Sequence, residues 1–148
     1  NNPLLPDPYI IKTTSSAVRS DARTCLKPDD VLGAWALDAK TIDVIWYALC
    51  REEPEIVLEC GGGLSTIIIA SYMKNLADVR PACNPLLITI EQDSLVADDI
   101  RKRLRNAGLE KYVRVLPTPL NERSGYDIDR AVLFEVLGER LIDFILMF

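Results

Sequence analysis

Histidine is absent from all 148 residues of the chain. No Ser-His or Cys-His nucleophile can therefore form within it. The four cysteines have neither a C-x-x-C pair nor any other paired spacing: Cys25, Cys50, Cys60 and Cys83. A structural zinc site uses four ligands in paired spacings, so we expect no metal site. Reduced, mostly buried thiols in a cytoplasmic protein are the simplest interpretation of these cysteines.

Long apolar runs and a surplus of positive charge are also absent. No apolar run approaches the roughly 18 to 20 residues of a membrane-spanning helix, and the first 30 residues lack a basic start followed by an apolar stretch. We therefore expect a soluble protein with no membrane partner. The formal net charge of -5 and the pI near 4.8 argue against a surface that binds nucleic acid.

One basic cluster departs from this acidic balance, and it comprises Arg101, Lys102, Arg103 and Arg105. Each of Asp98 and Asp99 precedes a basic residue of the cluster by four positions, which on a helix brings the two charges together. The spacing predicts the pairs Asp98 with Lys102 and Asp99 with Arg103. We interpret the cluster as a solvated helix face rather than an anion site.

Residues 1–37 are rich in proline and show no sustained period, so we expect an irregular arm followed by one domain over residues 38–148. The domain opens with an amphipathic helix, in which Ile42, Ile45, Trp46 and Leu49 share one face. Asp38 is placed to cap the start of this helix. Trp35, Trp46 and Tyr47 could form a stacking surface, although the helical spacing favours a core position for Trp46.

Short apolar runs then alternate with longer helical patterns, which is typical of βαβ units and a parallel sheet. The predicted strands are Ile56–Cys60, Leu86–Glu91, Val113–Leu116 and Leu141–Phe148. The first predicted helix runs from Ser65 to Asn75, with Ile68, Ile69, Tyr72 and Met73 inward. The second follows a cap at Asp93 or Ser94, ends at Gly108, and turns Val96, Ile100, Leu104 and Ala107 inward. The third runs from near Asp129 to before Gly138, with Val132, Leu133, Val136 and Leu137 inward. The predicted fold is α/β, a doubly wound and mainly parallel sheet of Rossmann-like topology.

The most informative segment is Glu55–Ala70, EIVLECGGGLSTIIIA. It reads as a buried strand with a carboxylate near its end, three glycines, and two hydroxyl residues that open a helix. Glycines permit backbone angles closed to other residues and a close approach of a ligand to the main chain. The free N–H groups at the start of the following helix favour negative groups of a ligand. Open α/β sheets bind their ligands at this end of the strands.

Two acidic residues narrow the choice of ligand. Glu59 stands two residues before the first glycine, where a carboxylate could receive the cationic amine of an amino-acid-like ligand. Glu91 ends the next predicted strand, where a carboxylate can accept hydrogen bonds from both ribose hydroxyls of a nucleoside. Together they predict a ligand in which a nucleoside is joined to an amino acid.

Segments Glu59–Thr66 and Ile88–Asp93 resemble the first two motifs of class I S-adenosylmethionine-dependent methyltransferases, and the resemblance covers Glu55–Phe148. It implies S-adenosylmethionine as cofactor and methyl transfer to a small-molecule acceptor. The implied cofactor-binding residues are Glu59, Cys60, Gly61, Gly62, Gly63, Ser65, Glu91 and Gln92. In this reading the glycine loop and Glu59 line the methionine portion, Glu91 holds the ribose, and Gln92 lies close to the adenine.

The chain departs from the family pattern at two places. Ser65 stands at the third glycine, as in an E-x-G-x-G-x-S-T form of the motif. In the fourth strand, Asp143 matches the first of two expected aspartates, but Phe148 takes the position of the second, so the resemblance assigns no catalytic residue. It also implies seven strands where four are predicted. Because the last predicted strand is apolar and uncovered, we expect a truncated domain or an edge buried by another chain, such as a homo-oligomer partner.

Two other functions remain open on the sequence. A nicotinamide-dependent oxidoreductase needs G-x-G-x-x-G, and the third glycine position is occupied by Thr66. A non-catalytic domain that keeps the fold is the second alternative. Tyr126, Asp127 and Asp129 follow the third strand and are either acceptor-site residues or a polar loop with a helix cap.

Overall fold

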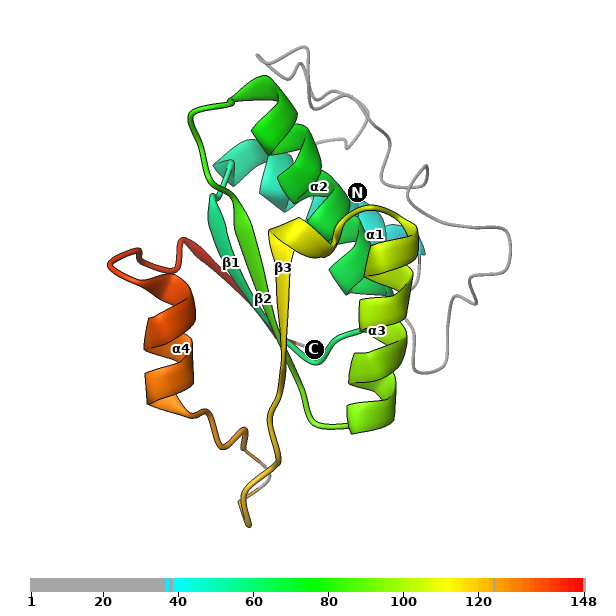
Figure 1. Cartoon of the computed structure of the whole chain (residues 1–148). Coiled ribbons are helices and arrows are strands. Elements are labelled where there is room, and N and C mark those ends of the chain that lie inside the picture. The colour runs from blue at the N-terminus through cyan, green and yellow to red at the C-terminus, as the bar shows by residue number, and fades with distance from the viewer. Residues whose placement is uncertain (1–36, 38, 124, 148) are drawn as a thin grey trace, which may run out of the picture.

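A parallel sheet forms the centre of the computed structural model, which describes residues 37, 39–123 and 125–147 (Figure 1). Its four strands lie in the order β3-β2-β1-β4. Their bounds are β1 (Ile56–Cys60), β2 (Leu86–Glu91), β3 (Val113–Pro117) and β4 (Phe144–Met147). The chain builds outward from β1 through β2 to β3, then returns to add β4 on the other side of β1. This reversal confirms the predicted doubly wound α/β fold of Rossmann-like topology.

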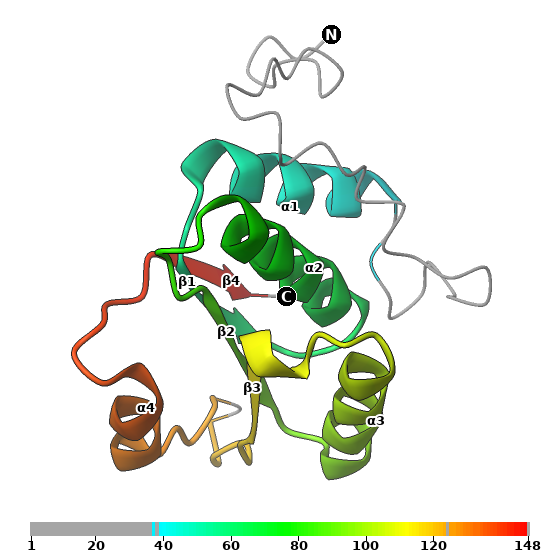
Figure 2. The same ribbon diagram turned by 45° about the horizontal axis from the view of Figure 1, so that its top comes forward.

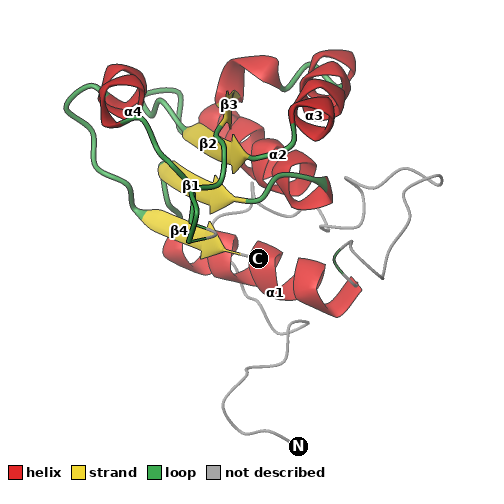
Figure 3. Ribbon diagram, turned by 90° about the horizontal axis from the view of Figure 1, so that it is seen from below, coloured by secondary structure: helices red, strands yellow, loops and turns green. Residues whose placement is uncertain are grey.

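Helices cover both faces of the sheet. They are α1 (Ala39–Glu52), α2 (Leu64–Val79), α3 (Ser94–Asn106) and α4 (Arg130–Leu137), with a short 3-10 turn, η2 (Glu110–Tyr112), before β3. Helices α1, α2 and α3 pack on one face, whereas α4 stands by itself on the other (Figure 2; Figure 3). We call these two faces of the sheet the three-helix face and the α4 face.

Each face has its own apolar core because successive strand residues point to opposite sides. Val57 and Leu87 belong to the core of the three-helix face, with Ile68 and Tyr72 of α2. Ile56, Leu58 and Ile88 belong to the core of the α4 face, with Leu137. Burial on both faces explains why β1 and β2 are nearly continuous apolar runs rather than alternating ones.

The predicted bounds of β1 and β2 are confirmed at both ends, and β3 extends one residue further, to Pro117. The predicted start of β4 is wrong by three residues, since the strand begins at Phe144 and Leu141 is 81% exposed. The chain joins the sheet only at Asp143, whose N–H donates to the Ile56 carbonyl at 2.9 Å. Asp38, Trp35 and Phe148 lie outside the described residues, as does the expected irregular arm apart from residue 37.

The predicted inward faces of two helices are partly wrong. In α3, Ile100 and Leu104 are buried, but Val96 is 38% exposed and Ala107 is exposed, and the buried residue of the first turn is Ala97. In α4, Leu137 is buried and Leu133 and Val136 are partly buried, whereas Val132 is 40% exposed. Each helix packs on its neighbours with one rotation about its own axis. That rotation determines which of two adjacent apolar residues is buried.

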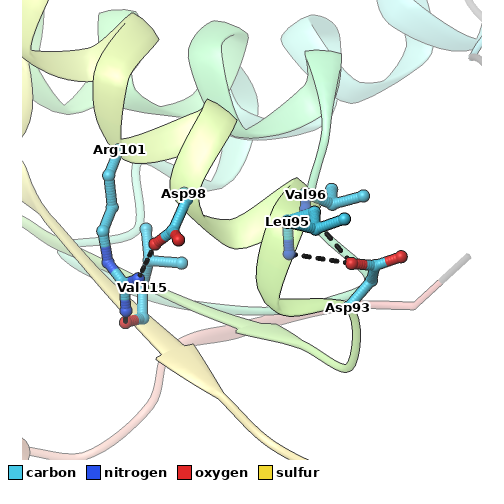
Figure 4. Close-up of polar contacts among 6 residues, drawn as sticks. All are labelled: Asp93, Leu95, Val96, Asp98, Arg101 and Val115. Carbon is cyan, nitrogen blue, oxygen red and sulfur yellow. Dashed lines mark hydrogen bonds and ion pairs between the residues drawn. The ribbon is translucent and has the colours of Figure 1, made fainter.

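The capping residues of these helices agree with the sequence. The Asp93 side chain accepts hydrogen bonds from the amides of Leu95 at 2.8 Å and Val96 at 3.4 Å, and so caps α3 (Figure 4).

Asp98 pairs with Arg101 at 2.8 Å rather than with the predicted Lys102. Arg101 is held there because its second nitrogen donates to the Val115 carbonyl of β3 at 2.9 Å (Figure 4).

Among the described residues, no helix combines the length and the apolar character that crossing a membrane requires.

Candidate functional site

The loop Gly61–Gly63 lies at the carboxyl end of β1 and leads into α2. β1 is the strand at which the strand order reverses. The chain adds β2 on one side of β1 and later returns to add β4 on the other side. In open parallel sheets, ligands bind beside the carboxyl ends of the strands at such a reversal. The glycine loop therefore stands where this architecture forms its ligand site.

The three glycines differ in what the surrounding chain demands of them. Gly61 has φ +87°, a conformation that side chains disfavour. A Cβ atom on Gly62 would lie 2.7 Å from both Ile100 Cδ1 and Thr89 Cγ2, so no side chain fits there. A Cβ atom on Gly63 would meet nothing within 4 Å among the described residues. Backbone geometry explains the first glycine and packing the second, while the third faces open space beside the strand tips.

All three loop amides are bonded to atoms of the chain itself. Gly61 N–H donates to the Ile90 carbonyl at 2.9 Å. Gly62 N–H donates to Glu91 Oε2 at 2.8 Å, and Gly63 N–H donates to Thr66 Oγ1 at 3.0 Å. The loop is thus held at β2 and at the first turn of α2, and it has one defined shape.

Glu59 lies beneath this loop and is fully buried. Its Oε2 accepts hydrogen bonds from Thr66 Oγ1 at 2.7 Å and Thr89 Oγ1 at 2.9 Å, and its Oε1 accepts one from Ser65 Oγ. Burial raises the pKa of Glu59 to about 7, although the three hydroxyl donors act in the opposite direction. A carboxylate offers about four acceptor positions, so three hydroxyls leave about one.

Glu91 occupies the tip of β2 and is 6% exposed. Its Oε1 accepts from the Asp93 amide and its Oε2 from the Gly62 amide, each at 2.8 Å. Each oxygen keeps one further acceptor position. The predicted ribose-binding residue is therefore fixed in orientation and can accept two further hydrogen bonds.

The two acids lie on the same face of the sheet. Glu59 pairs in register with Thr89, and Glu91 follows two residues later on β2, which returns its side chain to the same side. This is the three-helix face, to which their neighbours Val57 and Leu87 belong. Glu59, Glu91 and the glycine loop, predicted from separate motifs, are thus brought together.

The side chains of the other three predicted site residues lie in three different places. The Ser65 hydroxyl is buried against Glu59. Cys60 belongs to the core of the α4 face, on the side opposite to Glu59, and burial raises the pKa of its thiol. Gln92 is exposed just beyond β2. Of these side chains, Ser65 is part of the network under the loop and Cys60 points away from it.

Tyr126, from the loop after β3, packs against the core of the α4 face, and only its hydroxyl reaches the glycine loop. The hydroxyl of Tyr126 lies 3.6 Å from the Cβ position of Gly61, and burial raises its pKa. Asp129 caps α4 by accepting from the amides of Ala131 and Val132, and Asp127 is exposed. The interpretation as a helix cap is therefore confirmed for Asp129. The hydroxyl of Tyr126 lies beside Gly61, the first residue of the glycine loop.

Two residues singled out in the sequence serve the fold elsewhere. Trp46 is buried in the core of the three-helix face, edge-on to Tyr72 at 6.4 Å between ring centroids. Asp143 lies at the start of β4, where its Oδ2 accepts from the amides of Glu55 at 3.0 Å and Ile56 at 2.9 Å. This aspartate joins β4 to β1 at the end of the sheet opposite to the loop.

Thr89 is a site residue that the sequence interpretation missed. Its hydroxyl bonds to Glu59, and its methyl group lies against Gly62. The available signal was a single hydroxyl residue inside an otherwise apolar strand, LLITIE, two positions before the terminal acid.

Two surface pockets are lined by described residues. One, of about 260 Å³, lies between α3 and β3, and the other, of about 540 Å³, lies around the starts of β1 and β4. Neither of these two includes a residue of the glycine loop. Within the described ranges, no three or more carboxylates and thiols form a group that could hold a metal ion.

No protein-family model and no curated protein matches the chain. The functional assignment therefore depends on the geometry of the loop and its two acids.

Proposed function

We propose that the chain binds S-adenosylmethionine at the glycine loop and serves methyl transfer to a small-molecule acceptor. The observation that carries this proposal is the presence of two buried carboxylates on one face of the sheet, one at each strand tip beside the loop. Glu91, together with Glu59 above its pKa of about 7, gives the site a negative character, which favours a ligand with positive charge. S-adenosylmethionine, when bound, supplies a methyl group on a positively charged sulfur.

The hydrogen bonds of the loop amides weigh against a dinucleotide. Dinucleotide-binding loops direct free amides and a helix N-terminus at a pyrophosphate. Here the Gly62 amide is bonded to the Glu91 carboxylate, and the Gly63 amide is bonded to Thr66. A pyrophosphate at this loop would lie close to the negatively charged Glu91 side chain. It would also find the amides of the loop already occupied. The third glycine of the fingerprint, which permits close packing of helix on sheet, is replaced by the fully buried Thr66.

The residues present fit the proposed ligand in three respects. Gly63 leaves open space beside the backbone, so a ligand can approach the loop closely. Glu91 keeps two acceptor positions, enough for the two hydroxyls of one ribose. The first amides of α2, at Leu64 and Ser65, have no partner within the helix and suit the ligand's carboxylate. Gln92 lies on the adenine side of Glu91 in this proposal, and Glu59 with the backbone of Cys60 supports the methionine side.

Methyl transfer to a bound acceptor depends heavily on placement, because an acceptor aligned with the reacting bond gains much of its acceleration from proximity. We assign no general base. The role of these residues in the reaction is to hold the cofactor in one orientation.

The proposal is tested by calorimetric titration of the chain with S-adenosylmethionine, S-adenosylhomocysteine and NADH. We expect the first two to bind and NADH not to bind. Tighter binding of NADH, or no binding of the two sulfur ligands, contradicts the proposal and favours the oxidoreductase or the non-catalytic alternative.

The ribose contact is tested by a double-mutant cycle that combines Glu91→Gln with a 2′-deoxy analogue of S-adenosylhomocysteine. In the unchanged chain, removing the 2′-hydroxyl should weaken binding roughly 10-fold or more, because a hydrogen bond to a charged group contributes about 1.5 to 3 kcal/mol. In Glu91→Gln the same removal should have a much smaller effect. Glu135→Gln, which changes an exposed acid on α4, is the matched control. Equal losses in all three proteins would contradict the ribose assignment.

A further inference from the structure

The hydroxyl groups around Glu59 form a continuous connection from the buried carboxylate to the loop backbone. Gly63 N–H donates to Thr66 Oγ1 at 3.0 Å, and Thr66 Oγ1 in turn donates to Glu59 Oε2 at 2.7 Å. The Thr66 hydroxyl thus accepts from the loop and donates to the acid. Any change in what Glu59 accepts is transmitted to the Gly63 amide through one side chain.

The Glu59 carboxylate also spans three elements. It belongs to β1, accepts from Ser65 and Thr66 at the start of α2, and accepts from Thr89 on β2. Thr89 carries the connection to the second glycine, because its methyl group fills the space beside Gly62. The positions of the loop and of the first turn of α2 therefore depend on one buried group.

From this connection we infer that Glu59 is a positioning residue: it sets the orientation of the Gly63 amide and of the first turn of α2 through the Thr66 and Ser65 hydroxyls, and its protonation alters that orientation. As a carboxylate, Glu59 accepts from all three hydroxyls. As a carboxylic acid it must donate a hydrogen bond to a neighbour, so one of the three hydroxyls has to rotate and accept it. The hydrogen-bond network under the loop then has two arrangements that differ by one proton.

Three titratable groups lie near Glu59, and one of them shifts its pKa. Glu91 of β2 favours the protonated form of Glu59 by charge repulsion. Tyr126, from the loop after β3, and Cys60, the next residue of β1, are both neutral at neutral pH because burial raises each pKa. Of the described groups, Glu91 is thus the charge that opposes ionisation of Glu59, and the three hydroxyls favour it.

The orientation of Gly63 can be followed without a ligand by recording the pH dependence of its amide resonance in the ¹⁵N-labelled chain. We expect this resonance to titrate with a midpoint near the pKa of Glu59, about 7. The titration should disappear in Glu59→Gln and in Thr66→Val, and return in Thr66→Ser, which restores the hydroxyl. Ser71→Ala is the matched control, because Ser71 is a hydroxyl residue of α2 whose partner among the described residues is the Ile67 carbonyl.

Two further variants should move the midpoint in opposite directions. Thr89→Val removes a hydroxyl donor to the carboxylate and keeps the methyl group against Gly62, so the midpoint should rise. Glu91→Gln removes the neighbouring negative charge, so the midpoint should fall. A Gly63 resonance that does not titrate, or that titrates unchanged in Thr66→Val, overturns the inference. If Thr66→Val does not fold, the opposite shifts in Thr89→Val and Glu91→Gln decide the question, and shifts of the same sign overturn it.

The consequence for ligand binding rests on the proposed function. The affinity for S-adenosylhomocysteine should change with pH across the same midpoint in the unchanged chain and in Thr66→Ser, but not in Thr66→Val. If S-adenosylhomocysteine does not bind at all, the proposed function fails while the ligand-free titration of Gly63 still decides the inference. Ligand affinity that is independent of pH, together with a titrating Gly63 resonance, would overturn its extension to binding.

Discussion

The methyl group of Thr89 lies 2.7 Å from the position that a Cβ atom would take on Gly62. Ile100 Cδ1 lies equally close from the α3 side, so the loop backbone is packed between β2 and α3 with no space for a side chain. Gly62 is therefore required by packing within the chain, independently of any ligand.

We predict that substitution of Gly62 mainly lowers stability and that substitution of Gly63 mainly weakens ligand binding. Gly62→Ala should lower the free energy of unfolding by about 1 to 3 kcal/mol, as over-packing of a tight site does. Gly63→Ala, whose added methyl group meets open space, should lower it by about 1 kcal/mol at most, yet should weaken S-adenosylhomocysteine binding. Urea unfolding and calorimetry measure the two effects. Equal destabilisation by both substitutions would contradict this assignment.

A second prediction concerns stability and pH. The pKa of Glu59 is about 7 in the folded chain, against 4.5 for the free side chain. The folded state therefore binds more protons between these pH values, and the free energy of unfolding falls as pH rises through the window. At about 1.4 kcal/mol per pH unit of difference, the change approaches about 3 kcal/mol. The stabilisation is fully present below pH 4.5 and is lost above about pH 7.

Glu59→Gln isolates this contribution because it keeps the shape of the side chain and removes the proton. The difference in unfolding free energy between the unchanged chain and Glu59→Gln should shift steadily against the unchanged chain from pH 4.5 to 7.5. Chemical unfolding at several pH values provides the measurement. A difference that stays constant with pH would show that Glu59 titrates normally in the folded state.

The sheet and the site differ in how far the sequence determines them. β1 and β2 were predictable to the residue, because strands buried on both faces are nearly continuous apolar runs between turn residues. Glu59, Glu91 and the glycines were recognisable because their types and positions suit a ligand site. The three glycines in sequence did not reveal that a different physical reason accounts for glycine at each position. The packing around Gly62 involves Thr89 and Ile100, from elements far along the chain.

The errors have a common physical origin in tertiary contacts. Val96 and Ala97 are adjacent apolar residues, and only the docking of α3 decides that Ala97 is the buried one. Likewise, Asp98 has basic residues three and four positions ahead, and the Val115 carbonyl on β3 fixes Arg101 beside it. The late start of β4 depends on the hydrogen bonds that Asp143 accepts from Glu55, just before β1, and from Ile56, its first residue.

A third prediction tests Asp143. Asp143→Ala leaves the amides of Glu55 and Ile56 without their side-chain acceptor, so the free energy of unfolding should fall by about 1 to 3 kcal/mol. Asp143→Asn retains one carbonyl oxygen and should lose less. Because this end of the sheet lies opposite to the glycine loop, S-adenosylhomocysteine affinity at a temperature where both variants are folded should not change. A loss of affinity without a loss of stability would place Asp143 in the ligand site instead.

The two edges of the sheet are protected unequally, and the last prediction follows from that difference. At the β3 edge, Arg101 donates to the Val115 carbonyl and Arg114 to the Val113 carbonyl, so charged side chains cover the strand. On the edge strand β4, Phe144 and Leu146 pack on the three-helix face, whereas Ile145 and Met147 point to the α4 face and are 58% and 73% exposed. An uncharged, apolar edge strand is a template for pairing with another chain.

We therefore predict that the chain self-associates through β4 with increasing concentration. Ile145→Lys and Met147→Lys, which place a charge on that strand, should shift the sedimentation profile toward the monomer, whereas Val132→Lys on the exposed side of α4 should not. Arg101→Leu uncovers the Val115 carbonyl and should add association at the β3 edge, even when combined with Ile145→Lys. A chain that remains monomeric at all concentrations, or whose association survives both lysine substitutions, would show that β4 is not the contact.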